Sequence, residues 1–359
     1  MKKRVAVVGA TGIAGQQCLV ALARHPWFEV VMLAASERSA GKRYAEAIRD
    51  PATGAPRWWC GEAPPAEAMD LTVDHAEEVN LVGIDIVFSA VESDAARVLE
   101  PRYAQTTAVL STASAFRYED DVPILVPGVN LSHTALIDVQ RRRHRWRGFI
   151  APGPNCTTVG LVITLKPLLD RFGLQRVLMT SMQGVSGAGR SPGVAALDIL
   201  DNIIPFIPGE EDKVARETVK VLGTMGEGAV TPANFPVSAT CTRAAVTEGH
   251  TEAVAVSTTT ACTPKDVSAA FREFGTELVR LALPSAPQRL ITVHDAPFRP
   301  QPRLDRDADG GMTTSVGRIR IDGALENGIK YLLVSHNTKM GAAKGSVLTA
   351  ECLVAAGYV

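Results

Sequence analysis

The stretch Arg4-Val-Ala-Val-Val-Gly9-Ala-Thr-Gly12-Ile-Ala-Gly15 places three evenly spaced glycines directly after an apolar run. Residues 4–8 read as a buried strand, and residues 16–23 have the spacing of a helix. Glycines between a strand and a helix let the backbone turn sharply and approach a pyrophosphate, which the helix N-terminus then holds. A tight turn without a ligand is the alternative. The favoured interpretation is a dinucleotide-binding loop that includes Gly9, Thr11, Gly12 and Ile13.

The pattern that follows this loop indicates an α/β chain with two domains. Strand-like runs at 29–35, 85–89 and 108–111 alternate with helical stretches, which predicts a Rossmann-type, doubly wound parallel sheet over residues 1–153. Beyond residue 154 longer alternating strands predict an α+β domain with a mixed sheet, which we place at 154–336. These strands are expected at 176–183, 237–242, 251–258 and 312–321.

Composition excludes several classes of protein. The 359 residues carry a formal net charge of −1, with 46% hydrophobic and 21% charged residues, so no general attraction to nucleic acid is expected. The basic cluster 141–145 is interpreted as a solvated helix end, with a phosphate-backbone patch as the alternative. No apolar stretch reaches membrane-spanning length. Six scattered cysteines predict reduced thiols in a cytoplasmic enzyme and no metal site.

Cys156 is the strongest candidate for chemistry. It follows the turn Pro154-Asn155 and opens an apolar, helix-like run. At a helix N-terminus, free backbone N–H groups and the positive end of the helix dipole favour a thiolate. A nucleotide loop together with an activated cysteine suggests covalent thiol chemistry coupled to hydride transfer.

The residues after the second predicted strand indicate the cofactor. A 2′-phosphate requires cations and hydroxyls, whereas NAD-binding folds commonly place an acidic residue there. Ser36, Arg38 and Ser39 favour NADP, and Glu37 favours NAD if its side chain points inward. A solvated charged turn is the alternative.

For three other polar segments, the residues alone do not decide between a functional and a structural role. The loop 183–189, which includes Ser186 and Gly187, is rich in glycine and would allow a ligand to approach the backbone closely. On spacing alone, Glu210 to Lys213 are better explained as the N-terminal carboxylates and a face lysine of a helix. Arg243 and His250 lie at opposite ends of a turn between strands, and a lone histidine such as His250 is more often structural than catalytic.

Read together, the segments resemble aspartate-β-semialdehyde dehydrogenases of the archaeal and fungal branch. The resemblance spans nearly the whole chain in order. The blocks that carry it are GATGIAG at 9–15, ASERSAGKRY at 35–44, STASAFR at 111–117, PNCTTVGL at 154–161, QGVSGAGRSPG at 183–193, LDILDNIIPFIPGEEDKV at 197–214, ATCTRAAVTEGHTEAV at 239–254, RPQPRLD at 299–305 and HNTKMGAAKGSVLTAE at 336–351.

This resemblance implies a role for each matching residue. Cys156 would be the nucleophile, His250 the general acid/base, and Gln183 the residue that positions the thioester. Arg243 would pair with the substrate carboxylate and Glu210 with its ammonium group. The phosphate-binding positions would be Arg117, Lys213 and Asn155. Asn337 would approach the nicotinamide, which implies that the closing helix, within 337–359, completes the first domain.

The implied activity is NADP-dependent reductive dephosphorylation of L-4-aspartyl phosphate to the semialdehyde, on the route to lysine, threonine and methionine. Inorganic phosphate is the expected small-molecule partner, and a homodimer or homotetramer the expected assembly. Three departures from the family pattern leave room for a paralogue with another substrate, such as an acyl-CoA reductase of the malonyl-CoA reductase kind. They are Thr112, Gly128 and the pair Ala244-Ala245.

Overall fold

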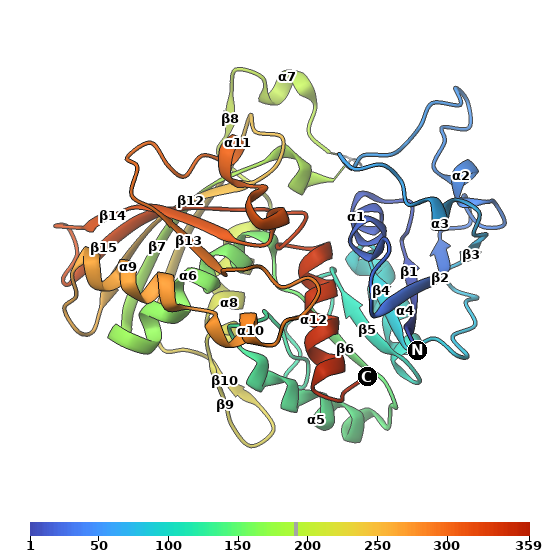
Figure 1. Cartoon of the computed structure of the whole chain (residues 1–359), viewed down its shortest axis with the longest axis horizontal. Helices are drawn as coiled ribbons and strands as arrows, with labels where there is room; N and C mark the ends of the chain where they lie inside the picture. The colour runs from blue at the N-terminus through green and yellow to red at the C-terminus, as the bar shows by residue number, and fades with distance from the viewer. Residues whose placement is uncertain (190–192) are drawn as a thin grey trace. The chain divides into compact units, whose positions relative to one another are not determined.

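The computed structural model describes residues 1–189 and 193–359, and the chain divides into two units (Figure 1). Unit 1 comprises Met1–Leu125, His133–Gly153 and Ala342–Val359, and unit 2 comprises Val126–Ser132 and Pro154–Gly341. The C-terminal segment therefore folds with the N-terminal one. The short segment Val126–Ser132 groups with unit 2, which the sequence pattern did not indicate.

Unit 1 contains a six-stranded, fully parallel sheet in the order β3-β2-β1-β4-β5-β6. The chain runs outward from β1 to β3 and then returns to the other side of β1, which is the doubly wound arrangement expected from the sequence. In such sheets, ligands bind at the carboxyl ends of the strands where the order reverses, here between β1 and β4. The strands are β1 (Lys3–Val8), β2 (Phe28–Ala35), β3 (Val73–His75), β4 (Ile86–Ser89), β5 (Ala108–Ser111) and β6 (Phe149–Pro152).

Helices cover both faces of this sheet. Val5 and Val7 of β1 belong to a core cluster with α1 and α12, whereas Ala6 and Val8 belong to another with α4. Since both faces are buried, the strands read as continuous apolar runs. The helical segments of unit 1 are α1 (Ile13–Leu22), α2 (Tyr44–Ala47), α3 (Ala66–Met69), α4 (Ser93–Ala104), α5 (Ala135–His144) and α12 (Ala343–Ala355), and η1 (Leu131–Thr134) has residues in both units.

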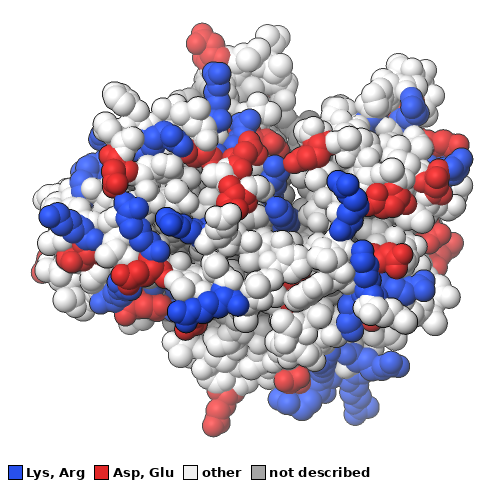
Figure 2. Space-filling view, in the orientation of Figure 1, with Lys and Arg blue, Asp and Glu red and all other residues white. Residues whose placement is uncertain are grey.

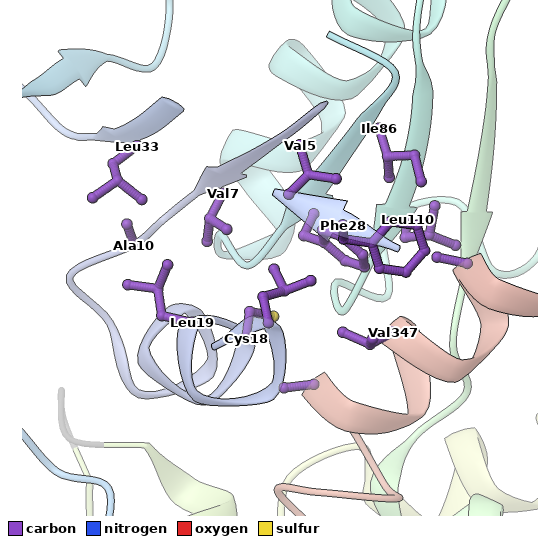
Figure 3. Close-up of a cluster of buried hydrophobic side chains, with 14 of the residues drawn as sticks. Val5, Val7, Ala10, Cys18, Leu19, Phe28, Leu33, Ile86, Leu110 and Val347 are labelled. Carbon is purple, nitrogen blue, oxygen red and sulfur yellow. The ribbon is translucent and has the colours of Figure 1, made fainter. Parts of the chain in front are cut away.

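The C-terminal helix α12 is part of the unit 1 core. Figure 3 shows Val347 of α12 in the same cluster as Cys18 and Leu19 of α1 and Leu110 of β5. Val347 is fully buried, and burial of one such aliphatic side chain stabilises a fold by about 1.5–3 kcal/mol. The apolar spacing of the closing helix is thus explained by packing in unit 1.

Unit 2 contains a seven-stranded mixed sheet in the order β13-β14-β15-β12-β7-β11-β8, as expected for an α+β fold. The pairs β7–β11 and β13–β14 are parallel, and the remaining neighbours are antiparallel. The strands are β7 (Leu174–Gln183), β8 (Ile203–Ile204), β11 (Val237–Ala244), β12 (His250–Thr258), β13 (Ile291–His294), β14 (Thr314–Ile321) and β15 (Gly328–Ser335), and a separate hairpin is formed by β9 (Thr224–Met225) and β10 (Val230–Thr231).

The long helix α6 packs on this sheet, and its residues from Thr157 to Leu165 are all buried. Its N-cap is Asn155, whose side chain accepts a hydrogen bond from the Thr157 N–H, so the helix begins at Cys156. The helical segments of unit 2 are α6 (Cys156–Phe172), η2 (Val185–Ala188), α7 (Ala196–Ile199), α8 (Glu210–Val221), α9 (Pro264–Glu273), α10 (Thr276–Arg280), α11 (Pro302–Asp305) and η3 (Ala308–Gly311).

Acidic and basic side chains are interspersed on the visible face, apart from a basic group over α5 (Figure 2). This group is the 141–145 cluster. Arg141 donates to the Tyr358 carbonyl and stacks over Phe149, and Arg143 pairs with Asp121. The cluster therefore anchors the end of α5, as the helix-end interpretation expects. Within residues 1–189 and 193–359, no helix is long and apolar enough to cross a membrane.

Candidate active site

Four polar residues form one row across the sheet of unit 2. Arg243 of β11 pairs in register with Gln183 of β7, and His250 of β12 pairs with Ser335 of β15. Gln183 and His250 face each other, because the next pair along is Met182–Thr251. Residues paired directly across strands point to the same face of a sheet, so strand register assembles this row. All four are at least 94% buried.

Cys156 lies against this row from the N-terminus of α6. Its Sγ is 3.2 Å from Nε2 of His250. Cys156 is half-buried, whereas Cys18, Cys241 and Cys352 are buried. The structure thus brings together, in one unit, the thiol and the histidine that the sequence separates by 94 residues.

The hydrogen bonds of His250 fix its tautomer. The Gly184 N–H donates to Nδ1 at 3.1 Å, so in the neutral ring the proton is on Nε2, which faces Cys156. Complete burial, with Arg243 as a further cause, lowers the pKa of His250 to about 3. His250 is therefore a neutral imidazole that presents an N–H to the sulfur.

Glu210, the first residue of α8, connects three parts of the site. Its Oε1 accepts from Asn155 Nδ2 at 2.9 Å, from Gln183 Nε2 at 3.1 Å and from Thr157 Oγ1 at 3.4 Å. The carboxylate therefore holds the cysteine turn and the Gln183 amide in place.

Glu217 follows Glu210 by two helical turns and accepts from the backbone N–H of Asn155. It is fully buried. Sequence reasoning did not select Glu217, although the seven-residue spacing places the two carboxylates on the same side of α8. Both stabilise the turn that precedes Cys156.

Arg243 and Gly187 define the open side of the row. Arg243 Nη1 donates to the Gly184 carbonyl at 2.9 Å and to Gln183 Oε1 at 3.4 Å. A Cβ at Gly187 would lie 2.9 Å from Nη1 of Arg243 and 3.3 Å from Cε1 of His250. Gly187 is exposed, so the missing side chain leaves space above the arginine and the histidine.

Asn337 joins two segments of the same site. Its Oδ1 accepts from the Gly249 N–H at 2.8 Å, and its Nδ2 donates to Ser186 Oγ at 2.9 Å. It fixes the residue before His250 and the loop that carries Gly187. From the sequence, Asn337 and Ser186 are both predicted to bind the cofactor, but their hydrogen bond to each other is not predicted.

The remaining phosphate candidates differ in their surroundings. Lys213 lies one turn after Glu210, is half-buried, and forms no side-chain hydrogen bond or ion pair with the described residues. Arg117 belongs to unit 1, in the loop after β5, and donates from Nη2 to the Thr112 carbonyl at 3.0 Å.

In the glycine loop of unit 1, two glycines are required for packing and a third is open to a ligand. A Cβ at Gly9 would lie 2.3 Å from the Ala90 carbonyl oxygen, and one at Gly15 would lie 2.2 Å from that of Gly9. At Gly12 the nearest atom would be 3.5 Å away, an ordinary contact. Gly9 and Gly15 are therefore required by the fold. Gly12 is exposed, which leaves its surface open to a ligand.

The first turn of α1 suits an anion. Gly12 is its N-cap and offers no side-chain hydrogen bond, and the first turn has no acidic residue. Thr11 precedes this cap and Ile13 begins the helix, so backbone N–H groups are available to a pyrophosphate.

The turn after β2 carries the residues expected to choose the cofactor. Ser36, Glu37 and Arg38 are exposed, whereas Ser39 is 4% exposed. The Lys42 ammonium donates to the Arg38 carbonyl at 2.8 Å, which brings a second cation to this turn. In residues 1–189 and 193–359 there is no group of three or more side chains suited to a metal ion.

The departure at Gly128 has a packing explanation. Gly128 has φ +80°, and a Cβ there would lie 2.4 Å from Cδ1 of Leu290. Leu290 fills the space that a longer residue at 128 would need. Thr112 is held by the Ser89 carbonyl, to which its N–H donates at 2.9 Å, and Ala244 pairs with Ile203 of β8.

Comparison with known proteins gives one consistent family. The family model "Semialdehyde dehydrogenase, NAD binding domain" matches residues 4–137, and "Semialdehyde dehydrogenase, dimerisation domain" matches residues 165–340. The aspartate-semialdehyde dehydrogenase of Methanothermobacter thermautotrophicus is 46% identical, with 97% of this chain and 98% of that protein covered. That of Saccharomyces cerevisiae is 41% identical, with 100% and 99% covered.

Solved structures agree over the whole chain. The crystal structure of aspartate semialdehyde dehydrogenase with NADP from Candida albicans has a TM-score of 0.89 at 38% identity and covers 100% of both chains. That of aspartate semialdehyde dehydrogenase II complexed with ASA from Vibrio cholerae has a TM-score of 0.77 at 27% identity, with 99% of both chains covered.

Proposed function

This chain belongs to the aspartate-semialdehyde dehydrogenase family, and we propose that it converts L-4-aspartyl phosphate to L-aspartate 4-semialdehyde with NADPH through a thioester on Cys156. The products are the semialdehyde, NADP⁺ and inorganic phosphate, and the reaction is reversible. The observation that carries this proposal is the 3.2 Å approach of Cys156 Sγ to His250 Nε2 at the start of α6. The biological role would be a step towards lysine, threonine and methionine.

In the first step the Cys156 sulfur attacks the acyl carbon, and the bond to the phosphate oxygen breaks. A thiolate at the N-terminus of α6 is stabilised by the helix dipole and by the Nε2–H of His250. Gln183 lies beside His250 in the row and is proposed to position the acyl group, as the family resemblance implies. Phosphate leaves, and a thioester remains on Cys156.

In the second step the thioester is reduced. Bound NADPH supplies the hydride. His250, with its proton on Nε2, is placed to donate a hydrogen bond to the acyl oxygen while that oxygen carries the negative charge, which passes to the sulfur when the carbon–sulfur bond breaks. The aldehyde is then released and Cys156 is regenerated.

Arg243 and Glu210 are proposed to bind the amino-acid part of the substrate. Among the described residues only Nη1 of Arg243 forms hydrogen bonds, so the rest of the fork is available for a carboxylate. Glu210 is proposed to pair with the ammonium group, with its Oε1 already holding Asn155 and Gln183.

For phosphate we propose Lys213, Arg117 and Asn155. Lys213 is the side chain with fewest internal partners of the three. The Asn155 amide already caps α6 and donates to Glu210, so one N–H of this amide is what it offers to an anion.

The residues of the cofactor site fit NADP. The open surface at Gly12 and the uncapped start of α1, with Gly9, Thr11 and Ile13, would hold the pyrophosphate. Ser36, Arg38 and Ser39 would hold the 2′-phosphate. From unit 2, Ser186, Gly187 and Asn337 are the proposed contacts near the nicotinamide. The dimerisation-domain match over residues 165–340 supports a homodimer or homotetramer.

The decisive experiment is semialdehyde oxidation with NADP⁺ and a choice of acyl acceptor. We expect turnover to require inorganic phosphate, to accept arsenate in its place, and to be unaffected by coenzyme A. Lys213→Ala should raise the KM for phosphate roughly tenfold, as loss of one charge-assisted contact does, and leave NADP affinity unchanged. Turnover that needs coenzyme A and ignores phosphate would instead identify an acyl-CoA reductase.

A further inference from the structure

Glu100 of α4 is a buried carboxyl group that two strand ends share. Ser89 Oγ donates to Glu100 Oε1 at 2.7 Å, and Ser111 Oγ donates to the same oxygen at 2.6 Å. Ser89 ends β4 and Ser111 ends β5, and the two are paired in register. Each of the three residues is 1% exposed. Burying a carboxyl group this deeply costs desolvation free energy, which its two hydrogen bonds offset only in part.

The same hydrogen-bond network continues to Arg117. Ser111 Oγ accepts from the Ala113 N–H at 3.0 Å, and the Thr112 N–H donates to the Ser89 carbonyl at 2.9 Å. Arg117 Nη2 in turn donates to the Thr112 carbonyl at 3.0 Å. Glu100 therefore fixes the start of the loop whose end carries Arg117, and all of these contacts lie within unit 1.

We propose that Glu100 is a positioning residue, which orients Arg117 for phosphate through Ser111 and Thr112 and regulates the charge that Arg117 offers. This inference rests on the proposed phosphate-binding role of Arg117. When Glu100 is ionised, its negative charge partly neutralises the nearby guanidinium and repels an incoming anion. When Glu100 is protonated, this neutralising charge and this repulsion are removed.

The charge state of Glu100 is poised to change near neutral pH. Burial raises its pKa to about 7, against the lowering effects of the Ser111 and Ser89 hydrogen bonds and of the Arg117 charge. Tyr103, on the same helix, is a further titratable group that its charge affects. Because this pKa is raised, the neutral form predominates below pH 7, and phosphate affinity should fall as pH rises through that value.

The test compares the KM for phosphate at pH 6 and pH 8 in wild-type protein and in Glu100→Gln, during semialdehyde oxidation. Phosphate itself titrates in this range, but equally for both proteins, so the ratio of their KM values isolates Glu100. The amide keeps an acceptor for both serines and carries no charge. We expect equal KM values at pH 6 and a KM about three- to tenfold lower in the variant at pH 8, the range of a coupling of up to one pK unit.

Two further variants separate positioning from charge. Glu100→Ala removes the acceptor and should raise the KM for phosphate at both pH values, with kcat at saturating phosphate changed less. Asp94→Asn removes an exposed charge from the same helix and should leave all values unchanged. If Glu100→Ala does not fold, the Glu100→Gln comparison still decides.

The inference is overturned if the ratio of KM values for Glu100→Gln and wild type is the same at pH 6 and pH 8, or if the variant alters stability alone. It is also overturned if the pH effect of Glu100→Gln persists when Arg117 is replaced by alanine. A wild-type enzyme that needs no phosphate would contradict the proposed function instead. In that case hydrogen exchange of residues 111–117 in Glu100→Gln and Glu100→Ala still tests the positioning role, which fails if both match wild type.

Discussion

His250 presents a proton to Cys156 rather than a lone pair, because the Gly184 N–H occupies Nδ1. This arrangement suits a sulfur that is already ionised and an acyl oxygen that gains negative charge later. Since the His250 pKa is lowered in the folded protein, its contribution to stability is present above the ordinary histidine range. It is lost as the pH falls from there towards 3. Acid should therefore weaken unit 2 at this point.

Cys156→Ser should retain the fold and NADP binding but lose nearly all turnover, because a hydroxyl is a far weaker nucleophile without a strong base. In wild-type protein, iodoacetamide should label Cys156 before the other five thiols. Burial raises the pKa of Cys18 and Cys352 to about 12 and that of Cys241 to about 11, so these three should label slowly. Mass spectrometry of a time course measures the order, and equal rates for Cys156 and Cys60 would argue against an activated thiol.

Arg38→Ala should weaken NADP binding far more than NAD binding, because only NADP offers a 2′-phosphate to the guanidinium. Loss of such a contact costs roughly 1.5–3 kcal/mol, or about ten- to a hundredfold in affinity. Fluorescence titration with both reduced cofactors measures this ratio. Glu37→Gln is the matched control on the same exposed turn. A wild-type preference for NAD would show that Glu37 governs the site.

At the scale of the element, Gly12 and Gly15 at the start of α1 are only three residues apart but have different roles: Gly15 is required for packing, and Gly12 is open to the cofactor. Gly15→Ala should destabilise unit 1 by about 1–3 kcal/mol, since its Cβ would meet the Gly9 carbonyl oxygen at 2.2 Å. Gly12→Ala should leave the melting temperature nearly unchanged and weaken NADPH binding at least about tenfold, which is 1.4 kcal/mol. Thermal unfolding and cofactor titration of both variants decide, and equal melting temperatures would refute the distinction.

Sequence patterns predict individual strands and helices better than any other feature of the structure. The strand at 4–8 corresponds to β1, the run at 176–183 to β7, and the helix at Cys156 to α6. These follow from local periodicity and from a capping asparagine. The strand β15 was not predicted, although its register with β12 places Ser335 beside His250. The segment GIKYLLVS at 328–335 has a lysine within its apolar run and no regular alternation of apolar and polar residues, so it matches neither strand pattern.

At the scale of the whole molecule, the sequence predicts the fold of each of the two domains but not the contacts that join distant segments. The Leu290 side chain against Gly128, the link from Asn337 to Gly249, and the Glu217 carboxylate at the Asn155 N–H each join residues more than 60 positions apart. No local pattern encodes such pairs. The grouping of Val126–Ser132 with unit 2 has the same origin.

The row Arg243–Gln183–His250–Ser335 also bears on how the protein becomes active. Its members come from strands that are neighbours in space but span more than 150 residues of chain, so three non-local pairings must form before the row exists. Such pairings are slow, because the entropy of closing long loops is lost before the contacts are gained. A pairing error of one residue would turn the displaced side chain to the opposite face of the sheet. We therefore expect catalytic competence to be a late event on the folding pathway, with activity recovering after the return of helical structure when the denatured protein is refolded.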